Sequence, residues 1–199
     1  MPRTEMKEET AVKKKKKVAR KNVEVRSNVK ARFDEIAQKE TESYESVSVL
    51  SLLRDSLSRL LTLWWLSKTN AGTFSIQFPG EDDAFEVVNR LGILSITPDI
   101  LDLKDADSYG RDRINLSIPI KLLEELEEIS IAQDKALTVV MRDSFHLELL
   151  LHQIYDQQGK AFFTLKNGVR VNVVDPIRVY NYAPGELKRL GDAIPEPVS

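Results

Sequence analysis

The chain matches itself at a fixed spacing, and this self-similarity constrains its fold more than any other feature. Residues 20–36 align on residues 113–129 without a gap, at an offset of 93 positions. Arg20 then meets Arg113 and Asn22 meets Asn115, while the apolar positions coincide as Val23 with Leu116, Val25 with Ile118, Val29 with Leu122, Phe33 with Leu126 and Ile36 with Ile129. Self-similarity of this kind predicts a structural unit that occurs twice.

A second register takes over further along the chain. At an offset of 88, the stretch LLRDSL at 52–57 falls on VMRDSF at 140–145, and Phe74 falls on Phe162. The change from 93 to 88 corresponds to one five-residue insertion in the first copy, around ETESYES at 40–46. Because insertions are tolerated in loops, we expect a connection between two elements at this place.

The residue pattern in each copy predicts the same order of elements: strand, helix, helix, strand. Aliphatic and polar residues alternate at the start of each copy, which is the period of a half-buried strand. The next apolar residues lie three and four positions apart and therefore share one face of a first helix. A second helix is predicted over 49–66 and over 137–154, apolar around most of its circumference, which indicates central burial or an oligomer seam. Strands are expected over 73–78 and 161–165, and Asn167-Gly168 predicts a hairpin turn into the stretch that follows.

These elements give the expected domain organisation. We expect a flexible basic arm over 1–19, a first unit over 20–78 and a second unit with a C-terminal hairpin over 113–182, followed by a flexible tail over 183–199. The connecting segment 79–112 is expected to hold a short helix near 84–91 and a strand near 93–96. Because the two units should pair with each other, we expect one compact α+β domain.

The composition excludes several classes of protein. The chain has no cysteine, so disulfides and thiolate metal sites are excluded, which fits a cytoplasmic location. The most apolar stretch, 47–67, contains Arg54, Asp55 and Arg59. Because burying these charges in lipid is costly, we interpret the stretch as a buried helix and expect no membrane span.

No residue pattern predicts catalysis or a cofactor. The sequence has neither a glycine-rich phosphate loop nor a nucleophile elbow. His146 and His152 lie six positions apart on one predicted helix, which places them on nearly opposite faces and does not suit a metal pair. We therefore expect no enzyme activity, no cofactor and no metal site.

Charge is distributed unevenly along the chain. Residues 1–30 hold eleven Lys or Arg against four Glu, a net charge of +7. Since the whole chain carries −2, the remaining residues carry −9. A basic arm on an acidic body favours a polyanionic partner for the arm, although lysine runs also serve simply to keep a tail soluble.

A short strand with one polar and one apolar face, followed by two helices, resembles the ribbon-helix-helix family of DNA-binding proteins, of the Arc and MetJ type. The resemblance covers residues 20–66 and 113–154. In that family two chains pair their strands into an antiparallel ribbon that enters the DNA major groove, and their second helices cross in the shared core. Here both halves occur in one chain. The resemblance therefore implies an α+β fold in which two strand-helix-helix-strand repeats form a single-chain pseudo-dimer with extra strands and a hairpin.

The resemblance also implies which side chains contact DNA bases. Those on the outward face of the paired strands are Arg20, Asn22, Glu24, Arg113, Asn115 and Ser117. Arginine suits guanine O6 and N7, asparagine suits adenine, and glutamate suits the N4 amino group of cytosine. For each residue the alternative is an ordinary solvated position on an exposed strand.

Phosphate contacts are expected from the start of each second helix and from the basic arm. In the family, backbone N–H groups at the start of the second helix hold a phosphate. The arm would add a salt-sensitive contribution that does not depend on sequence. The predicted phosphate contacts are Lys13, Lys14, Lys15, Lys16, Lys17, Lys21, Ser46, Ser48, Lys135 and Thr138. The acidic residues of the second unit's first helix must then face away from DNA: Glu124, Glu125, Glu127 and Glu128.

Three hypotheses for function follow. The first is a sequence-specific double-stranded DNA-binding protein, such as a transcriptional repressor or a plasmid or phage accessory factor. The second is a protein-interaction module, an antitoxin or assembly adaptor that uses the same scaffold to bind a protein partner or a second copy of itself. The third is nonspecific RNA binding by the arm alone.

Overall fold

The computed structural model describes residues 18–43, 47–69, 72–94, 96, 100–101, 103 and 110–173. These residues form four α-helices and two antiparallel sheets, so the predicted α+β class is confirmed. In chain order the elements are β1 (Val18–Arg26), α1 (Ser27–Ser43), α2 (Val49–Thr69), β2 (Thr73–Gln77), β3 (Phe85–Asn89), β4 (Gly92–Ile93), β5 (Arg111–Pro119), α3 (Ile120–Ala132), α4 (Leu137–Asp156), β6 (Lys160–Thr164) and β7 (Arg170–Val173).

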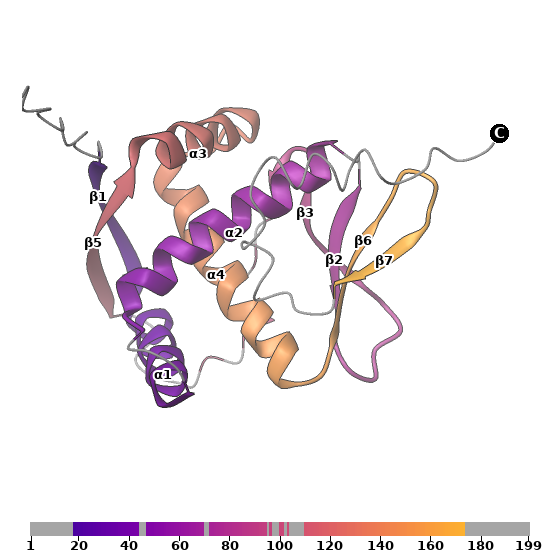
Figure 1. Cartoon of the computed structure of the whole chain (residues 1–199), viewed down its shortest axis with the longest axis horizontal. Coiled ribbons are helices and arrows are strands. Elements are labelled where there is room, and N and C mark those ends of the chain that lie inside the picture. The colour runs from indigo at the N-terminus through magenta and orange to yellow at the C-terminus, as the bar shows by residue number, and fades with distance from the viewer. Residues whose placement is uncertain are drawn as a thin grey trace, which may run out of the picture.

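The two sheets lie at opposite ends of the molecule, with the helices between them (Figure 1). One sheet is the two-stranded ribbon β1–β5, and the other has five strands in the order β4-β3-β2-β6-β7. Helices α2 and α4 cross in the middle, while α1 and α3 lie on either side near the ribbon (Figure 1). The buried apolar side chains of the ribbon, the helices and the larger sheet form one hydrophobic cluster.

Corresponding elements of the two halves are separated by the offsets that the sequence predicts. Strands β1 and β5 differ by 93 positions at both ends, as do the first residues of α1 and α3. Helices α2 and α4 both begin at positions that differ by 88. The five-residue insertion was expected in a loop, but residues 40–43 continue helix α1, where the Thr41 hydroxyl donates to the Ala37 carbonyl at 2.7 Å. Residues 44–46 lie outside the described part of the chain.

The larger sheet is centred on the pairing of β2 with β6. This pairing aligns Phe74 with Phe163 and Ser75 with Phe162, and the Phe74 and Phe163 rings pack 5.1 Å apart. The hairpin predicted at Asn167-Gly168 joins β6 to β7. Gly168 adopts a φ of 80°, a left-handed conformation that suits glycine because it lacks a Cβ.

The prediction of a helix near residues 84–91 is wrong. Residues 85–89 form strand β3 instead, and the chain turns at Arg90 and Leu91 into β4, which ends at Ile93. Val87 and Val88 are both buried in this strand, and their β-branched side chains favour it over a helix. Gly92 has a φ of 136°, and a Cβ there would collide with the Gln133 side chain, so glycine fits this turn.

Helices α2 and α4 provide most of the core between the two sheets. Most of the apolar side chains on both helices are buried, which agrees with the central burial expected for them. Phe145 of α4 meets Phe33 of α1 edge to face, with ring centroids 6.1 Å apart. Within the described residues, no helix has the length and apolar character that crossing a bilayer requires.

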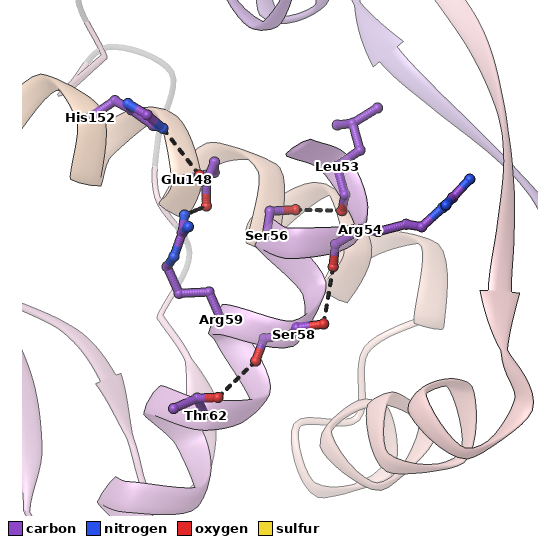
Figure 2. A network of polar contacts seen from close by, with 8 residues as sticks. All are labelled: Leu53, Arg54, Ser56, Ser58, Arg59, Thr62, Glu148 and His152. Carbon is purple, nitrogen blue, oxygen red and sulfur yellow. Dashed lines mark hydrogen bonds and ion pairs between the residues drawn. The ribbon is translucent and has the colours of Figure 1, made fainter. Parts of the chain in front are cut away.

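A buried polar cluster joins α2 to α4 where they cross (Figure 2). Arg59 of α2 donates to Glu148 of α4, and both side chains are almost fully buried. Glu148 also contacts Nε2 of His152 at 3.2 Å, one turn further along α4. The neighbouring hydroxyls of Ser56 and Thr62 bond back to carbonyls of their own helix, at 2.8 Å and 3.0 Å (Figure 2). The interhelical polar contact at this place is therefore the pair of Arg59 and Glu148, and His152 joins it through Glu148 on its own helix.

Burial keeps the imidazole of this cluster neutral. The pKa of His152 is lowered from 6.5 to about 4, mainly by desolvation and in smaller part by the nearby charge of Arg59. A neutral ring with its proton on Nε2 can donate to the Glu148 carboxylate. The cluster then holds one positive and one negative charge, which compensate each other in the core.

Removing the Glu148 charge should strongly destabilise the fold. The variant Glu148→Gln removes the buried carboxylate that Arg59 bonds across the helix crossing, and breaking a buried pair in this way costs about 3 to 5 kcal/mol. Urea unfolding of the variant measures this loss. The matched control is Glu124→Gln on the exposed face of α3, which should change the free energy of unfolding by no more than about 0.5 kcal/mol.

Acid should destabilise the protein through His152. Because the folded pKa of about 4 lies below the ordinary 6.5, the unfolded chain binds a proton in this pH window that the folded chain does not. The contribution of neutral His152 to stability is thus complete above pH 6.5, and the free energy of unfolding falls by up to about 1.4 kcal/mol per pH unit as the pH drops toward 4. Urea midpoints of wild type and His152→Gln across this window test the assignment, since the variant should lose the extra slope. Equal slopes in the two proteins would contradict it.

Candidate nucleic-acid interface

The ribbon brings together all six residues that the sequence predicts as base contacts. Strands β1 and β5 pair antiparallel along their whole length, from Val18 opposite Pro119 to Arg26 opposite Arg111. Alternation along each strand places the six on one face, where Ser117 is half-buried and the other five are exposed: Arg20, Asn22, Glu24, Arg113, Asn115 and Ser117. The predicted pairing of the two strands, and the outward direction of this face, are therefore confirmed.

The opposite face of the ribbon explains why the strands adopt this register. Val23 and Val25 of β1 are buried, as are Ile114, Leu116 and Ile118 of β5. A shift by one residue would turn these aliphatic side chains to solvent and the charged ones into the core. The hydrophobic pattern thus fixes which side chains form the outer face.

The two central asparagines lie opposite each other. Asn22 pairs with Asn115, and on either side Arg20 pairs with Ser117 and Glu24 with Arg113. At the offset of 93, Asn115 is also the residue that corresponds to Asn22. The ribbon therefore has an approximate two-fold axis at this pair, while the flanking pairs differ and make the outer face asymmetric.

The outer face is positively charged. It carries Arg20, Arg26, Arg111 and Arg113 against the single carboxylate of Glu24. Glu24 lies 3.8 Å from Arg111, and both side chains are largely exposed, so this ion pair is weak. The net charge of +3 on one narrow strip suits a polyanion.

Arg26 and Arg111 are the two charged residues of this face that the sequence reasoning missed. They form the last pair of the ribbon, because both strands extend two residues beyond Glu24 and Arg113. The signal was present in the sequence, since both arginines continue the alternation of outward positions.

The starts of the two second helices differ. At α2, the Ser48 hydroxyl accepts from the Ser51 N–H and the Ser51 hydroxyl accepts from the Ser48 N–H, both at 3.1 Å. This reciprocal cap satisfies donors that the prediction assigned to a phosphate. At α4, Ala136 precedes the helix without a side-chain cap, and Thr138 is exposed.

Two predicted phosphate contacts have other surroundings. The Lys135 ammonium lies 3.1 Å from Asp143 and 3.4 Å from the Ile93 carbonyl, so it links the start of α4 to strand β4. Lys21 is half-buried and shares its strand face with Val23, on the side of the ribbon that packs on the helices. Ser46 and the arm residues Lys13 to Lys17 lie outside the described part of the chain.

Comparisons with protein-family models, with curated proteins and with solved structures found no match to this chain.

The central asparagines should be dispensable for stability. Asn22→Ala and Asn115→Ala remove exposed side chains and should change the free energy of unfolding by no more than about 0.5 kcal/mol. By contrast, Leu116→Ala leaves a cavity under the ribbon and should cost about 2 to 5 kcal/mol. Chemical denaturation compares the three variants. A large loss in either asparagine variant would assign these residues a structural role instead.

Proposed function

We propose that this chain is a sequence-specific double-stranded DNA-binding protein of the ribbon-helix-helix type, with both halves of the ribbon supplied by one polypeptide. The observation that carries the proposal is the outer face of β1–β5, which gathers Arg20, Asn22, Arg113 and Asn115 on one exposed strip. A two-stranded ribbon fits the major groove, which is about 12 Å wide. Arginine and asparagine are also the side chains that read guanine and adenine there by paired hydrogen bonds.

Three features support a pseudo-dimer as the underlying architecture. Corresponding elements of the two halves start at constant offsets. The ribbon is centred on Asn22 and Asn115, which correspond to each other at the offset of 93. In the larger sheet, Phe74 pairs with Phe163 and Ser75 pairs with Phe162. At the offset of 88, Phe74 corresponds to Phe162 and Ser75 corresponds to Phe163, so these two pairs are equivalent to each other. Such a chain would behave as a repressor or a plasmid or phage accessory factor.

The DNA site of such a protein is expected to be asymmetric. On one side of the central asparagines, Glu24 lies opposite Arg113. On the other side, Arg20 lies opposite Ser117. A carboxylate accepts from cytosine N4, whereas the serine hydroxyl that corresponds to it both donates and accepts. The two half-sites should therefore differ in sequence, unlike the palindrome that two identical chains would read.

Selection of duplexes from a random library, followed by gel shifts, tests the proposal. Wild type should enrich one asymmetric sequence and bind it more tightly than unrelated DNA. Arg113→Ala with Asn115→Ala should lose about 1 to 3 kcal/mol of discrimination for each base contact removed, and should keep its affinity for unrelated DNA. Lys166→Ala on the hairpin turn is a control far from the ribbon. Absence of any binding by wild type at low salt would contradict the proposal.

The basic arm should act differently from the ribbon. Replacing Lys13 to Lys17 by glutamine should reduce affinity for all duplexes and flatten its dependence on salt, because each phosphate contact contributes about 0.9 to the slope. The selected sequence should stay the same. If the arm variant loses all binding to DNA and RNA, the arm alone carries the activity.

A second candidate is a protein-interaction module, favoured by apolar side chains on the sheet farthest from the ribbon. Phe85, Leu91, Val169 and Val171 are between 42% and 56% exposed there. Strand β7 pairs with β6 along one edge of the described sheet, so it offers its other edge to a second copy of this chain. Sedimentation of wild type and Val171→Lys distinguishes the candidates, since only the module predicts association that the variant abolishes.

A further inference from the structure

The two ends of the ribbon differ in charge. At one end Arg26 is paired with Arg111, and at the other Val18 is paired with Pro119. At the offset of 93 these two pairs correspond to each other, so the approximate two-fold axis relates an arginine pair to an apolar pair. Within the two described strands, the outer face therefore has a cationic end where Arg26 pairs with Arg111, and its other end is apolar.

At this cationic end, a third arginine joins Arg26 and Arg111 in lining a surface hollow. The hollow has a volume of about 310 Å³, and its polar lining consists of Glu24, Arg26, Arg111, Arg142, Asp143 and His146. Arg142 comes from the second turn of α4, whereas Arg26 and Arg111 belong to the outer face of the ribbon. Arginines from three elements thus surround one space that is continuous with the outer face.

The carboxylates of the hollow leave it positively charged. Asp143 is paired with Lys135 at 3.1 Å, and Glu24 lies 3.8 Å from Arg111. Among the described residues, neither Arg26 nor Arg142 has an ion pair within 4.0 Å. His146 lines the same hollow as both arginines. Burial is the main cause that lowers the pKa of His146, the Asp143 carboxylate opposes this shift, and the charges of Arg26 and Arg142 add to the lowering. With Lys135 included, four cations face two carboxylates.

We propose that this hollow binds a phosphodiester of the DNA strand that flanks the ribbon, and that the protein therefore binds its site in one orientation. The inference rests on the proposed function and adds to it the residues that hold the backbone at one end. The planar guanidinium groups of Arg26 and Arg142 can each hold two phosphate oxygens, which a lysine cannot match in geometry.

The corresponding place at the other ribbon end lacks this arrangement. At the offset of 88, Arg54 corresponds to Arg142, and it is also exposed. Its neighbour Asp55 corresponds to Asp143, but the position that corresponds to Lys135 is Val47. The strand residues at that end are Val18 and Pro119, so within the described strands this end carries no arginine pair like Arg26 and Arg111. Arg54 is therefore a matched comparison for Arg142 within one molecule.

The test compares single variants on the duplex that wild type selects. Dissociation constants are measured over a range of KCl concentrations for wild type, Arg142→Ala, Arg54→Ala, Arg142→Lys and Lys166→Ala. We expect Arg142→Ala to reduce the slope of log affinity against log salt by about 0.9, the value of one phosphate contact. Arg142→Lys should keep the slope because it keeps the charge, and Arg54→Ala and Lys166→Ala should leave the slope unchanged.

Duplexes with uncharged methylphosphonate linkages on one flank or the other locate the contact. Neutralising the flank at the arginine end should weaken binding by wild type and have no further effect on Arg142→Ala. Equal slope changes in Arg142→Ala and Arg54→Ala, or the same sensitivity to either flank in both proteins, would overturn the inference while leaving DNA binding intact. Absence of a selected duplex for wild type would instead contradict the proposed function.

Discussion

The pairing of β1 with β5 is the constraint on which the rest of the arrangement depends. In the described part of the chain, each of these strands has the other as its sole neighbour, and 84 residues separate the end of β1 from the start of β5. An unpaired strand would leave its backbone N–H and C=O groups unsatisfied, and an isolated hairpin is only marginally stable. The ribbon is therefore stable because the helices that follow each strand pack beneath it and bury its aliphatic face.

Joining both halves in one chain changes the physics of this pairing. Two separate chains would form the ribbon only at concentrations above their dissociation constant, whereas here its formation is intramolecular and does not depend on concentration. One polypeptide can also carry different residues at corresponding positions. The difference between Arg26–Arg111 and Val18–Pro119, which underlies the oriented binding proposed above, is unavailable to two identical chains.

The buried pair of Arg59 and Glu148 likewise depends on different residues at corresponding positions of the two halves. At the offset of 88, Arg59 corresponds to Leu147 and Glu148 corresponds to Leu60. A dimer of two copies of the first half, packed in this way, would bury Arg59 against Leu60. A dimer of two copies of the second half would bury Glu148 against Leu147. Each would leave an uncompensated charge in the core, at a cost of several kcal/mol. The polar cluster therefore favours pairing of α2 with α4 over pairing of identical halves.

By itself, the sequence determined the elements of the two repeated units and the faces that they bury. The period-2 pattern around Val23 and Leu116 and the helical spacing of Phe33 and Leu126 are local signals, because backbone geometry dictates which residues share a face. The six outward residues of the ribbon followed from that alternation. The helix expected near 84–91 failed because a short segment with Val87 and Val88 depends on its neighbours in the sheet, which local periodicity does not report.

The tertiary structure alone decided the contacts between residues far apart in the chain. It placed Arg142 beside the Arg26–Arg111 end of the ribbon, joined Arg59 to Glu148 across the helix crossing, and directed Lys135 to Asp143 and the Ile93 carbonyl. Such contacts arise from the packing of whole elements. Sequence periodicity fixes how each element turns its side chains, but the distance between two elements is set by everything packed between them.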